Sequence, residues 1–289
     1  MAGWRPRVTC SATDRESRDV RHFLWSTAAC CTALFLACAA QTAFAEDPAA
    51  LVHDASYNEV QAHTESGGWA YQIEKRVDGK VLTEEQIDTP KGPVYRVMAI
   101  DGKPLNAAQQ QKEKAREQEL LNNPALEAKA DKEYKDDEHQ LQKLLQLLPE
   151  AFLFQEKSQS GRYEVLSFRP NPAFHPDGYV QRVMQALEGE VTIDLQDKRI
   201  AHMNGRVAHK VEFGFGILGR IDQGGTFEIG RQEVAPNLWR TTLIHIDVTG
   251  RFSFFATVTR QEYEVRSNFR RVPENLTVRQ AFQLLDAMQ

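Results

Sequence analysis

Apolar and polar residues alternate through most of the second half of the chain. Residues 189–195 show the two-residue period that a half-buried β-strand requires. Short turns rich in Gly, Asn or Asp separate further runs of the same kind, and this spacing is typical of an antiparallel meander. The pattern predicts six strands in succession, over residues 189–195, 199–208, 211–217, 226–233, 238–249 and 252–269.

Shorter elements precede and follow this meander. Helical spacing predicts a helix over residues 49–64 and a closing amphipathic helix over residues 273–288. The positions expected to face inward in the closing helix are Val278, Phe282 and Leu285. Further strands are predicted over residues 69–75, 81–88, 94–100, 151–157 and 162–168, and a short helix over residues 178–187.

A charged insert interrupts the strands between residues 106 and 148. Asn106 is a good N-cap for a first helix, and Pro124 separates that helix from a second one, which Pro149 is expected to end. The second helix carries an apolar stripe, formed by Leu141, Leu144, Leu145 and Leu148. Two interpretations fit this stripe. The insert is either a solvated helical hairpin anchored on the sheet at one end, or a lid across an open barrel mouth.

Residues 1–45 have the features of a secretory signal peptide. Five arginines precede an uncharged apolar run, which ends in an Ala-Phe-Ala cleavage pattern. Residues 46–289 are therefore expected to form a single exported, periplasmic domain. The apolar run is diluted by Ala, Thr and Cys, so we do not expect a transmembrane protein after cleavage.

All four cysteines lie in this leader, and the domain that follows has no disulfide or thiolate. Cys38 is a poor lipid attachment site because Phe35 replaces the aliphatic residue expected three positions before it. Removing the leader takes five arginines and three acids from 35 basic and 40 acidic side chains, leaving 30 and 37 and a net charge of −7. A mildly acidic protein is a poor partner for nucleic acid.

Motifs that carry catalysis are missing from the sequence. There is no nucleophile elbow, phosphate loop, dinucleotide-binding fingerprint or zinc-binding His-Glu-x-x-His helix. The seven histidines after residue 45 are not spaced as metal ligands, although His202 and His245 lie on strands that folding could bring together. The acidic runs of the insert are typical of solvated helix faces. We therefore expect no enzyme, no metal and no cofactor.

Apolar rows on the predicted strands are the feature with ligand-binding potential. Closed on themselves, these rows would form a core; left open, they would line a concave pocket for an acyl chain or a similar guest. Six glycines between residues 214 and 230 favour strong curvature of the sheet. The candidate ligand-binding residues are Val211, Phe213, Phe215, Ile217, Phe227, Ile229, Ile244, Ile246, Phe252 and Phe254.

Three stretches carry a resemblance to a known family: Tyr95–Leu105 followed by the charged helix, Leu187–Asp194, and Val265–Arg271. With its leader, short helix, helical insert and long meander, the chain resembles the periplasmic lipoprotein-carrier (LolA/LolB-like) superfamily. The resemblance implies an α+β, mainly β fold: a strongly curved antiparallel sheet, or open half-barrel, with helices on its concave side and the charged helical insert. Members of that superfamily bind lipoprotein acyl chains, lipids or partner proteins.

The function expected from these features is a non-catalytic periplasmic binding or carrier protein for an acyl chain, lipid or other hydrophobic ligand. The alternative is an envelope protein–protein interaction module. In that case helices 106–148 meet a partner protein and the sheet only supports them.

Overall fold

A computed structural model describes residues 46–64, 68–213, 219–252 and 256–288. The chain divides into two units, residues 1–45 and 46–289, and all described residues belong to the second. The expected leader with Cys38, and the candidate residues Phe215, Ile217 and Phe254, lie outside the described residues.

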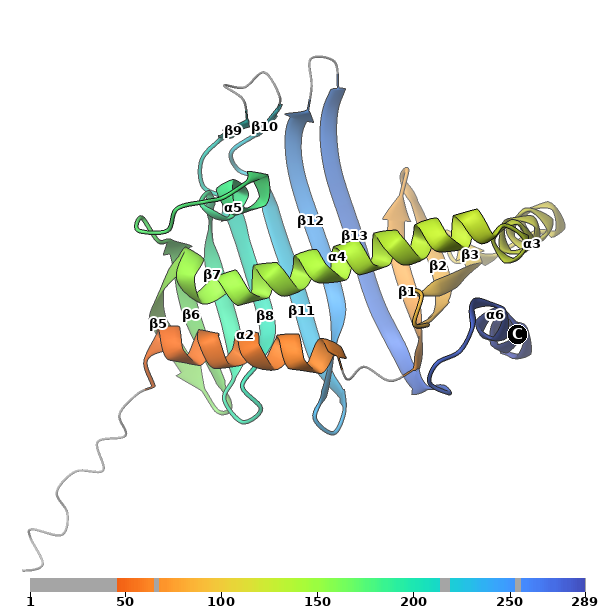
Figure 1. Cartoon of the computed structure of the whole chain (residues 1–289), viewed down its shortest axis with the longest axis horizontal. Helices are drawn as coiled ribbons and strands as arrows, with labels where there is room; N and C mark the ends of the chain where they lie inside the picture. Colours follow the sequence, from red (N-terminus) through yellow and green to blue (C-terminus); the bar gives the residue numbers. More distant parts are fainter. Residues whose placement is uncertain (1–45, 65–67, 214–218, 253–255, 289) are drawn as a thin grey trace, which may run out of the picture. The chain divides into compact units, whose positions relative to one another are not determined.

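Thirteen strands form one antiparallel sheet, which confirms that the fold is α+β and mainly β (Figure 1). The strands are β1 (Trp69–Val77), β2 (Lys80–Ile87), β3 (Val94–Ile100), β4 (Lys103–Pro104), β5 (Phe152–Ser160), β6 (Tyr163–Pro170), β7 (Leu187–Asp194), β8 (Arg199–Val207), β9 (Val211–Phe213), β10 (Gly219–Ile221), β11 (Thr226–Ala235), β12 (Leu238–Phe252) and β13 (Ala256–Arg271). Their order is β4-β3-β2-β1-β13-β12-β11-β8-β7-β6-β5. Because β4 and β5 form the two ends of this order, the sheet is not closed.

The third strand predicted for the meander is not part of this order. Residues 211–213 and 219–221 form the short pair β9 and β10, which attaches to the end of β12. The main sheet instead continues directly from β8 to β11. Backbone hydrogen bonds join Val207 to Gly224 and Gly225 at 2.9 and 2.8 Å. The register of these two strands therefore excludes the intervening segment from the sheet.

Five helices accompany the sheet in the described part of the chain: α2 (Pro48–Thr64), α3 (Ala107–Asn122), α4 (Pro124–Ala151), α5 (Tyr179–Met184) and α6 (Val278–Ala287). Asn106 is the N-cap of α3, as predicted, and forms a capping box with Gln109. The prediction that Pro149 ends the second helix is wrong, because α4 continues to Ala151. Pro149 lies in the last turn, where its missing N–H leaves only the Leu145 carbonyl without its helical partner.

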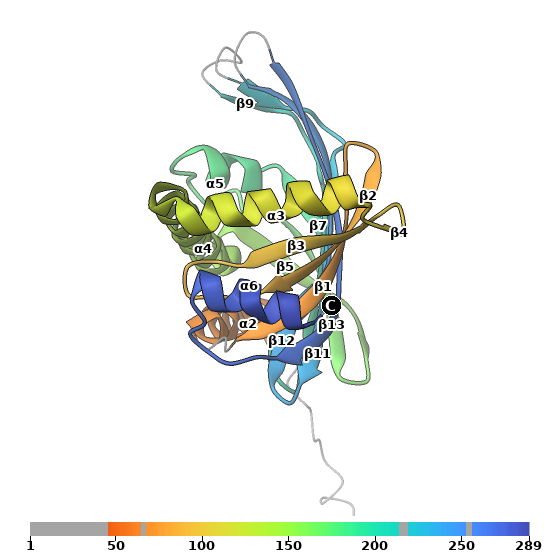
Figure 2. The same cartoon turned by 90° about the vertical axis from the view of Figure 1, so that its right-hand side faces the viewer.

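The main core lies between α2, the C-terminal part of α4 and strands β5 to β8 (Figures 1 and 2). From α2 it receives Leu51, Val52 and Ala55, each no more than 1% exposed. The apolar stripe of α4 packs here through Leu144, Leu145 and Leu148, whereas Leu141 stays 41% exposed. We call the face of the sheet that carries this core the inner face.

A second core lies on the opposite, outer face of β1 to β3. Ala70, Ile87 and Val94 pack there against α6, whose Val278, Phe282 and Leu285 point inward as predicted. Directly paired residues share a face of a sheet, and neighbours along a strand alternate. The paired residues that connect the main core to β1 are Met203, Ile229, Ile244, Glu264 and Lys75. Ile73 and Tyr71 therefore lie on the inner face, and Ala70 on the outer one.

Side chains of α3 protect the edge of the sheet at β3. The Val97 N–H donates to Glu113 Oε1 at 3.0 Å, and Arg116 Nη2 donates to the Tyr95 carbonyl at 2.6 Å. These contacts occupy backbone groups that an edge strand otherwise leaves open for pairing. Glu117, only 5% exposed, accepts two hydrogen bonds from Arg96 at 2.5 and 2.7 Å. The first helix of the charged insert is thus part of the fold.

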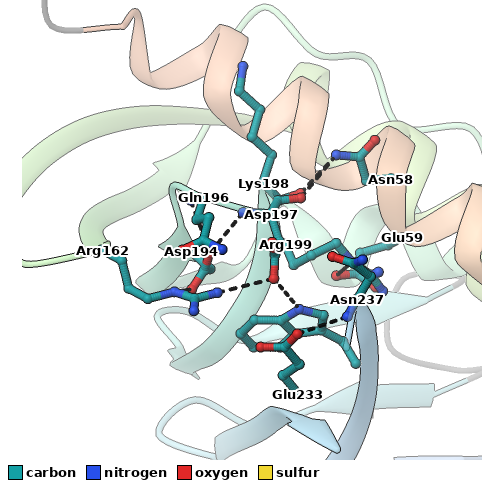
Figure 3. Close-up of polar contacts among 11 residues, drawn as sticks. Asn58, Glu59, Arg162, Asp194, Gln196, Asp197, Lys198, Arg199, Glu233 and Asn237 are labelled. Atoms are coloured by element: carbon teal, nitrogen blue, oxygen red, sulfur yellow. Dashed lines mark hydrogen bonds and ion pairs between the residues drawn. The ribbon is translucent and has the colours of Figure 1, made fainter. Parts of the chain in front are cut away.

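A buried ion network holds α2 on the sheet (Figure 3). Glu59 of α2 is 3% exposed and accepts hydrogen bonds from Arg199 Nε and Nη2 at 2.9 and 2.8 Å. The Ile200 N–H donates to the same carboxylate at 3.1 Å, and Arg231 of β11 forms a further ion pair with it. One carboxylate therefore connects α2 to both β8 and β11.

The loop between β7 and β8 is fixed by two aspartates of the same region (Figure 3). Asp194, fully buried, accepts the backbone N–H groups of Gln196 and Asp197 at 3.0 and 2.9 Å and forms an ion pair with Arg162. Asp197 accepts from Trp239 Nε1 at 3.1 Å. These bonds join the loop to the turn before β6 and to β12.

Replacing Glu59 by Gln should lower the free energy of unfolding by about 3–5 kcal/mol, because Arg199 and Arg231 then stay buried without their counter-charge. Urea unfolding followed by tryptophan fluorescence measures this change. Glu212→Gln, which breaks an exposed ion pair with Lys210, is the matched control and should leave the urea midpoint unchanged. Equal effects of the two substitutions would contradict the role given to Glu59.

The acid dependence of stability should also report on Glu59. Burial alone would raise the pKa of this carboxyl, but hydrogen bonds and charge from Arg199 and Arg231 hold the pKa below its ordinary value. Such a carboxylate stabilises the fold above the unfolded-state pKa of about 4.3, and this contribution is lost as the pH falls through the lower folded-state pKa. Below about pH 4.3 the free energy of unfolding should therefore fall more steeply in the wild type than in Glu59→Gln. Parallel curves would refute this.

Candidate functional site

An open hollow of about 990 Å³ lies across strands β5 to β8, β11 and β12. One rim consists of Leu153, Arg169, Glu188, Arg206 and Thr226. The other consists of Gln155, Ser167, Glu190, Asn204, Glu228 and His245. Between the rims run Phe154, Phe168, Gly189, Gly205 and Phe227. We call this feature the outer hollow.

The outer hollow lies on the side of the sheet away from α2 and α4. Phe168 and Val191 are buried in the main core, so their neighbours Ser167 and Glu190 point to the opposite face. The residues between the rims alternate along each strand with the rim residues. The phenylalanine side chains among them therefore point to the inner face, and only the backbone of these residues borders the hollow. Gly189 and Gly205 are directly opposite one another, and a Cβ atom on Gly189 would lie 2.0 Å from the Asn204 carbonyl oxygen. Glycine is required at this crossing.

Charged pairs dominate the rims of the outer hollow. Arg206 Nη2 lies 2.6 Å from Glu188 Oε1, and Lys157 forms an ion pair with Glu190. His202 Nε2 lies 3.0 Å from Glu228 Oε1. The His245 ring packs edge-on against Tyr263 at 5.7 Å between centroids. This lining offers donors and acceptors for polar groups along both rims, together with an apolar surface of similar extent.

The ligand-binding residues predicted from the sequence do not lie together in one site. Val211 and Phe213 are buried in a small core with α5, where the Phe213 ring meets Tyr179 edge-on at 5.0 Å. Phe227 packs against the main core and also borders the outer hollow. Phe252 is the last residue of β12, where its backbone pairs with Gly219 of β10.

Three of the predicted residues do come together. Ile229, Ile244 and Ile246 lie on the inner face of β11 and β12, where Ile229 pairs with Ile244 and Phe227 with Ile246. All three isoleucines are half-buried, and none belongs to a buried cluster within the described residues. We call them the isoleucine row.

A buried polar cluster was not anticipated from the sequence. Tyr71, 6% exposed, donates from its hydroxyl to Asp88 Oδ1 at 3.2 Å and accepts from Gln86 Nε2 at 2.5 Å. Burial raises the pKa of Asp88 above its ordinary value even though Arg240 opposes the rise. Burial likewise raises the pKa of Tyr134 on α4 to about 12. The sequence predicted only a strand over residues 69–75 here, and strand alternation does not identify the polar partners of a buried tyrosine.

No group of three or more histidine, cysteine or acidic side chains in the described part of the chain is placed to hold a metal ion. Glu228 is flanked by His245, directly opposite on β12, and by His202 on β8. Among the described helices, none combines the length and hydropathy needed to cross a membrane. Comparisons with protein-family models, curated proteins and solved structures find no match to this chain.

Proposed function

We propose that this chain is a non-catalytic periplasmic binding or carrier protein for an acyl chain, a lipid or another hydrophobic ligand. The proposal includes a LolA/LolB-like architecture, in which the open sheet curves strongly around its helical side, and export by the leader 1–45. The observation that carries the proposal is the isoleucine row, an apolar surface on the helical side that belongs to no buried cluster of the described residues.

The isoleucine row favours an apolar ligand on energetic grounds. Complete burial of one isoleucine side chain stabilises by about 1.5–3 kcal/mol relative to exposure, so covering three half-buried ones is a substantial gain. Figure 1 shows α4 crossing in front of β11 and β12 on this side. We infer that the ligand lies between α4 and the isoleucine row. The outer hollow, with its charged rims, is the less suitable surface for such a ligand.

Removing apolar surface from the isoleucine row should weaken ligand binding. We expect Ile244→Ser and Ile246→Ser to reduce affinity for a fluorescent fatty-acid probe at least tenfold, about 1.4 kcal/mol, because each removes apolar contact area. Tyr163→Ser, at a 40% exposed aromatic residue of β6, is the matched control and should leave affinity unchanged. Native mass spectrometry of the purified protein, followed by organic extraction, identifies any bound lipid. Failure of the wild type to bind the probe would refute the proposal.

A second candidate is an envelope protein–protein interaction module that uses the helical insert. The observation that favours it is the charged solvent side of α4, where Lys129–Glu133, Lys132–Asp136 and Lys135–Asp131 form ion pairs four residues apart. The three lysines are 64–76% exposed. Exposed pairs of this kind contribute little to stability, so this surface is available for a partner.

Charge reversal tests this second candidate without damaging the fold. Deleting α3 is unsuitable, because Glu113, Arg116 and Glu117 hold the β3 edge. The triple substitution Lys129→Glu, Lys132→Glu and Lys135→Glu should abolish capture of an envelope partner that the wild type retains in a pull-down. The matched control reverses Lys210, an exposed lysine of the β9 region. Retention of every partner by the triple variant would exclude this candidate.

A further inference from the structure

Unpaired hydrogen-bond donors are buried beside Trp69. This residue is 2% exposed, and its indole Nε1 has no hydrogen-bond partner among the described residues. Within the same part of the chain, the Nε and Nη2 atoms of Arg240 are also buried without a partner. The guanidinium carbon of Arg240 lies 5.5 Å from the centroid of the Trp69 ring. Buried donors are nearly always bonded in folded proteins, and an unmet one costs about 1–3 kcal/mol.

The surroundings of these donors are rich in positive charge. The guanidinium carbon of Arg271 lies 4.5 Å from the centroid of the same Trp69 ring. Nearby acids are already engaged: Glu264 pairs with Arg266 at 2.9 Å, and Asp88 accepts from the Tyr71 hydroxyl. Burial lowers the pKa of Arg240, while Asp88 opposes that change through charge. Among the described residues these three donor atoms therefore have no acceptor, and an added oxyanion would supply one.

Arg240 lies on the same strand as the isoleucine row, beyond a register shift between Leu243 and Thr241, and its charge interaction with Tyr71 places its guanidinium on the inner face. It lies on β12, four residues before Ile244 and six before Ile246. At about 3.3 Å per residue these separations are roughly 13 and 20 Å along the strand. A ligand whose chain covers the isoleucine row would therefore bring one end close to Arg240.

We propose that Trp69 and Arg240 bind the oxyanion of an amphipathic ligand, a carboxylate or phosphate group whose apolar chain lies on the isoleucine row. This inference rests on the proposed function and adds the chemical class of the ligand's head group. The N–H groups of Trp69 and Arg240 donate to the anionic oxygens. Asp88 interacts with Arg240 through charge, and it limits affinity by repelling the same anion.

Isothermal titration calorimetry on the purified protein tests the inference with three probes: dodecanoate, the neutral dodecanamide and inorganic phosphate. We expect dodecanoate to bind at least tenfold more tightly than dodecanamide. Arg240→Met should remove this preference while leaving the affinity for dodecanamide unchanged. Trp69→Phe, which removes one donor and keeps an aromatic ring, should reduce the preference in part. Asp88→Asn should strengthen the binding of dodecanoate.

A matched control and the remaining outcomes separate this inference from the proposed function. Arg220→Met alters an exposed arginine of β10 that pairs with Asp222, and it should change no affinity. Equal binding of dodecanoate and dodecanamide would overturn the head-group inference and leave the hydrophobic carrier intact. Binding of neither would overturn both. Phosphate that binds as tightly as dodecanoate, with the same dependence on Arg240, would overturn the assignment to a head group and identify a free anion as the ligand.

Discussion

The carboxylate of Glu59 is the contact on which the arrangement of helices and strands depends. It lies between Arg199 of β8 and Arg231 of β11, and it brings the C-terminal half of α2 onto the sheet. A buried charge is tolerated only where partners compensate for its lost hydration, so this position of α2 is tightly specified. Leu51, Val52 and Ala55 then complete the main core on the inner face.

The division of helices between the two faces determines which surfaces are left for ligands. The helices α2 and α4 cover the inner face at β5 to β8, whereas α6 covers the outer face at β1 to β3. Two surfaces follow from this division. The isoleucine row on the inner face is apolar, and the outer hollow is rimmed by charged pairs. The isoleucine row suits an acyl chain better, because binding in the outer hollow would place the apolar chain against hydrated charges.

Local features of the sequence predicted local structure well. The two-residue alternation located most strands, including the two that Asp78 and Gly79 join in a tight turn with φ of 50° and 75°, and Asn106 caps α3 as predicted. Errors occurred where distant contacts decide the outcome. Residues 211–213 pair with β10 because β8 and β11 are joined at Val207, and no local pattern reports that register. The pairing of Glu59 with two arginines likewise joins residues far apart in the sequence, so no local pattern reports it.

The candidate site was predicted only in part, for a related reason. Alternation identified Ile229 on one strand and Ile244 and Ile246 on the next as apolar candidates, but the sequence did not show that they share a face or which face the helices cover. Phe213 had the same alternation and is instead buried against α5. The unpaired donors of Trp69 and Arg240 come from strands far apart in the sequence, so that only the fold brings them together.

We propose that an apolar ligand occupies the space between α4 and the isoleucine row. Photo-crosslinking with a diazirine-bearing fatty acid, followed by peptide mapping, tests it most directly. The account predicts labelled peptides from β11, β12 and α4. Labelling confined to the rims of the outer hollow, at residues such as Arg169 and Glu188, would contradict it, as would the absence of any specific labelling.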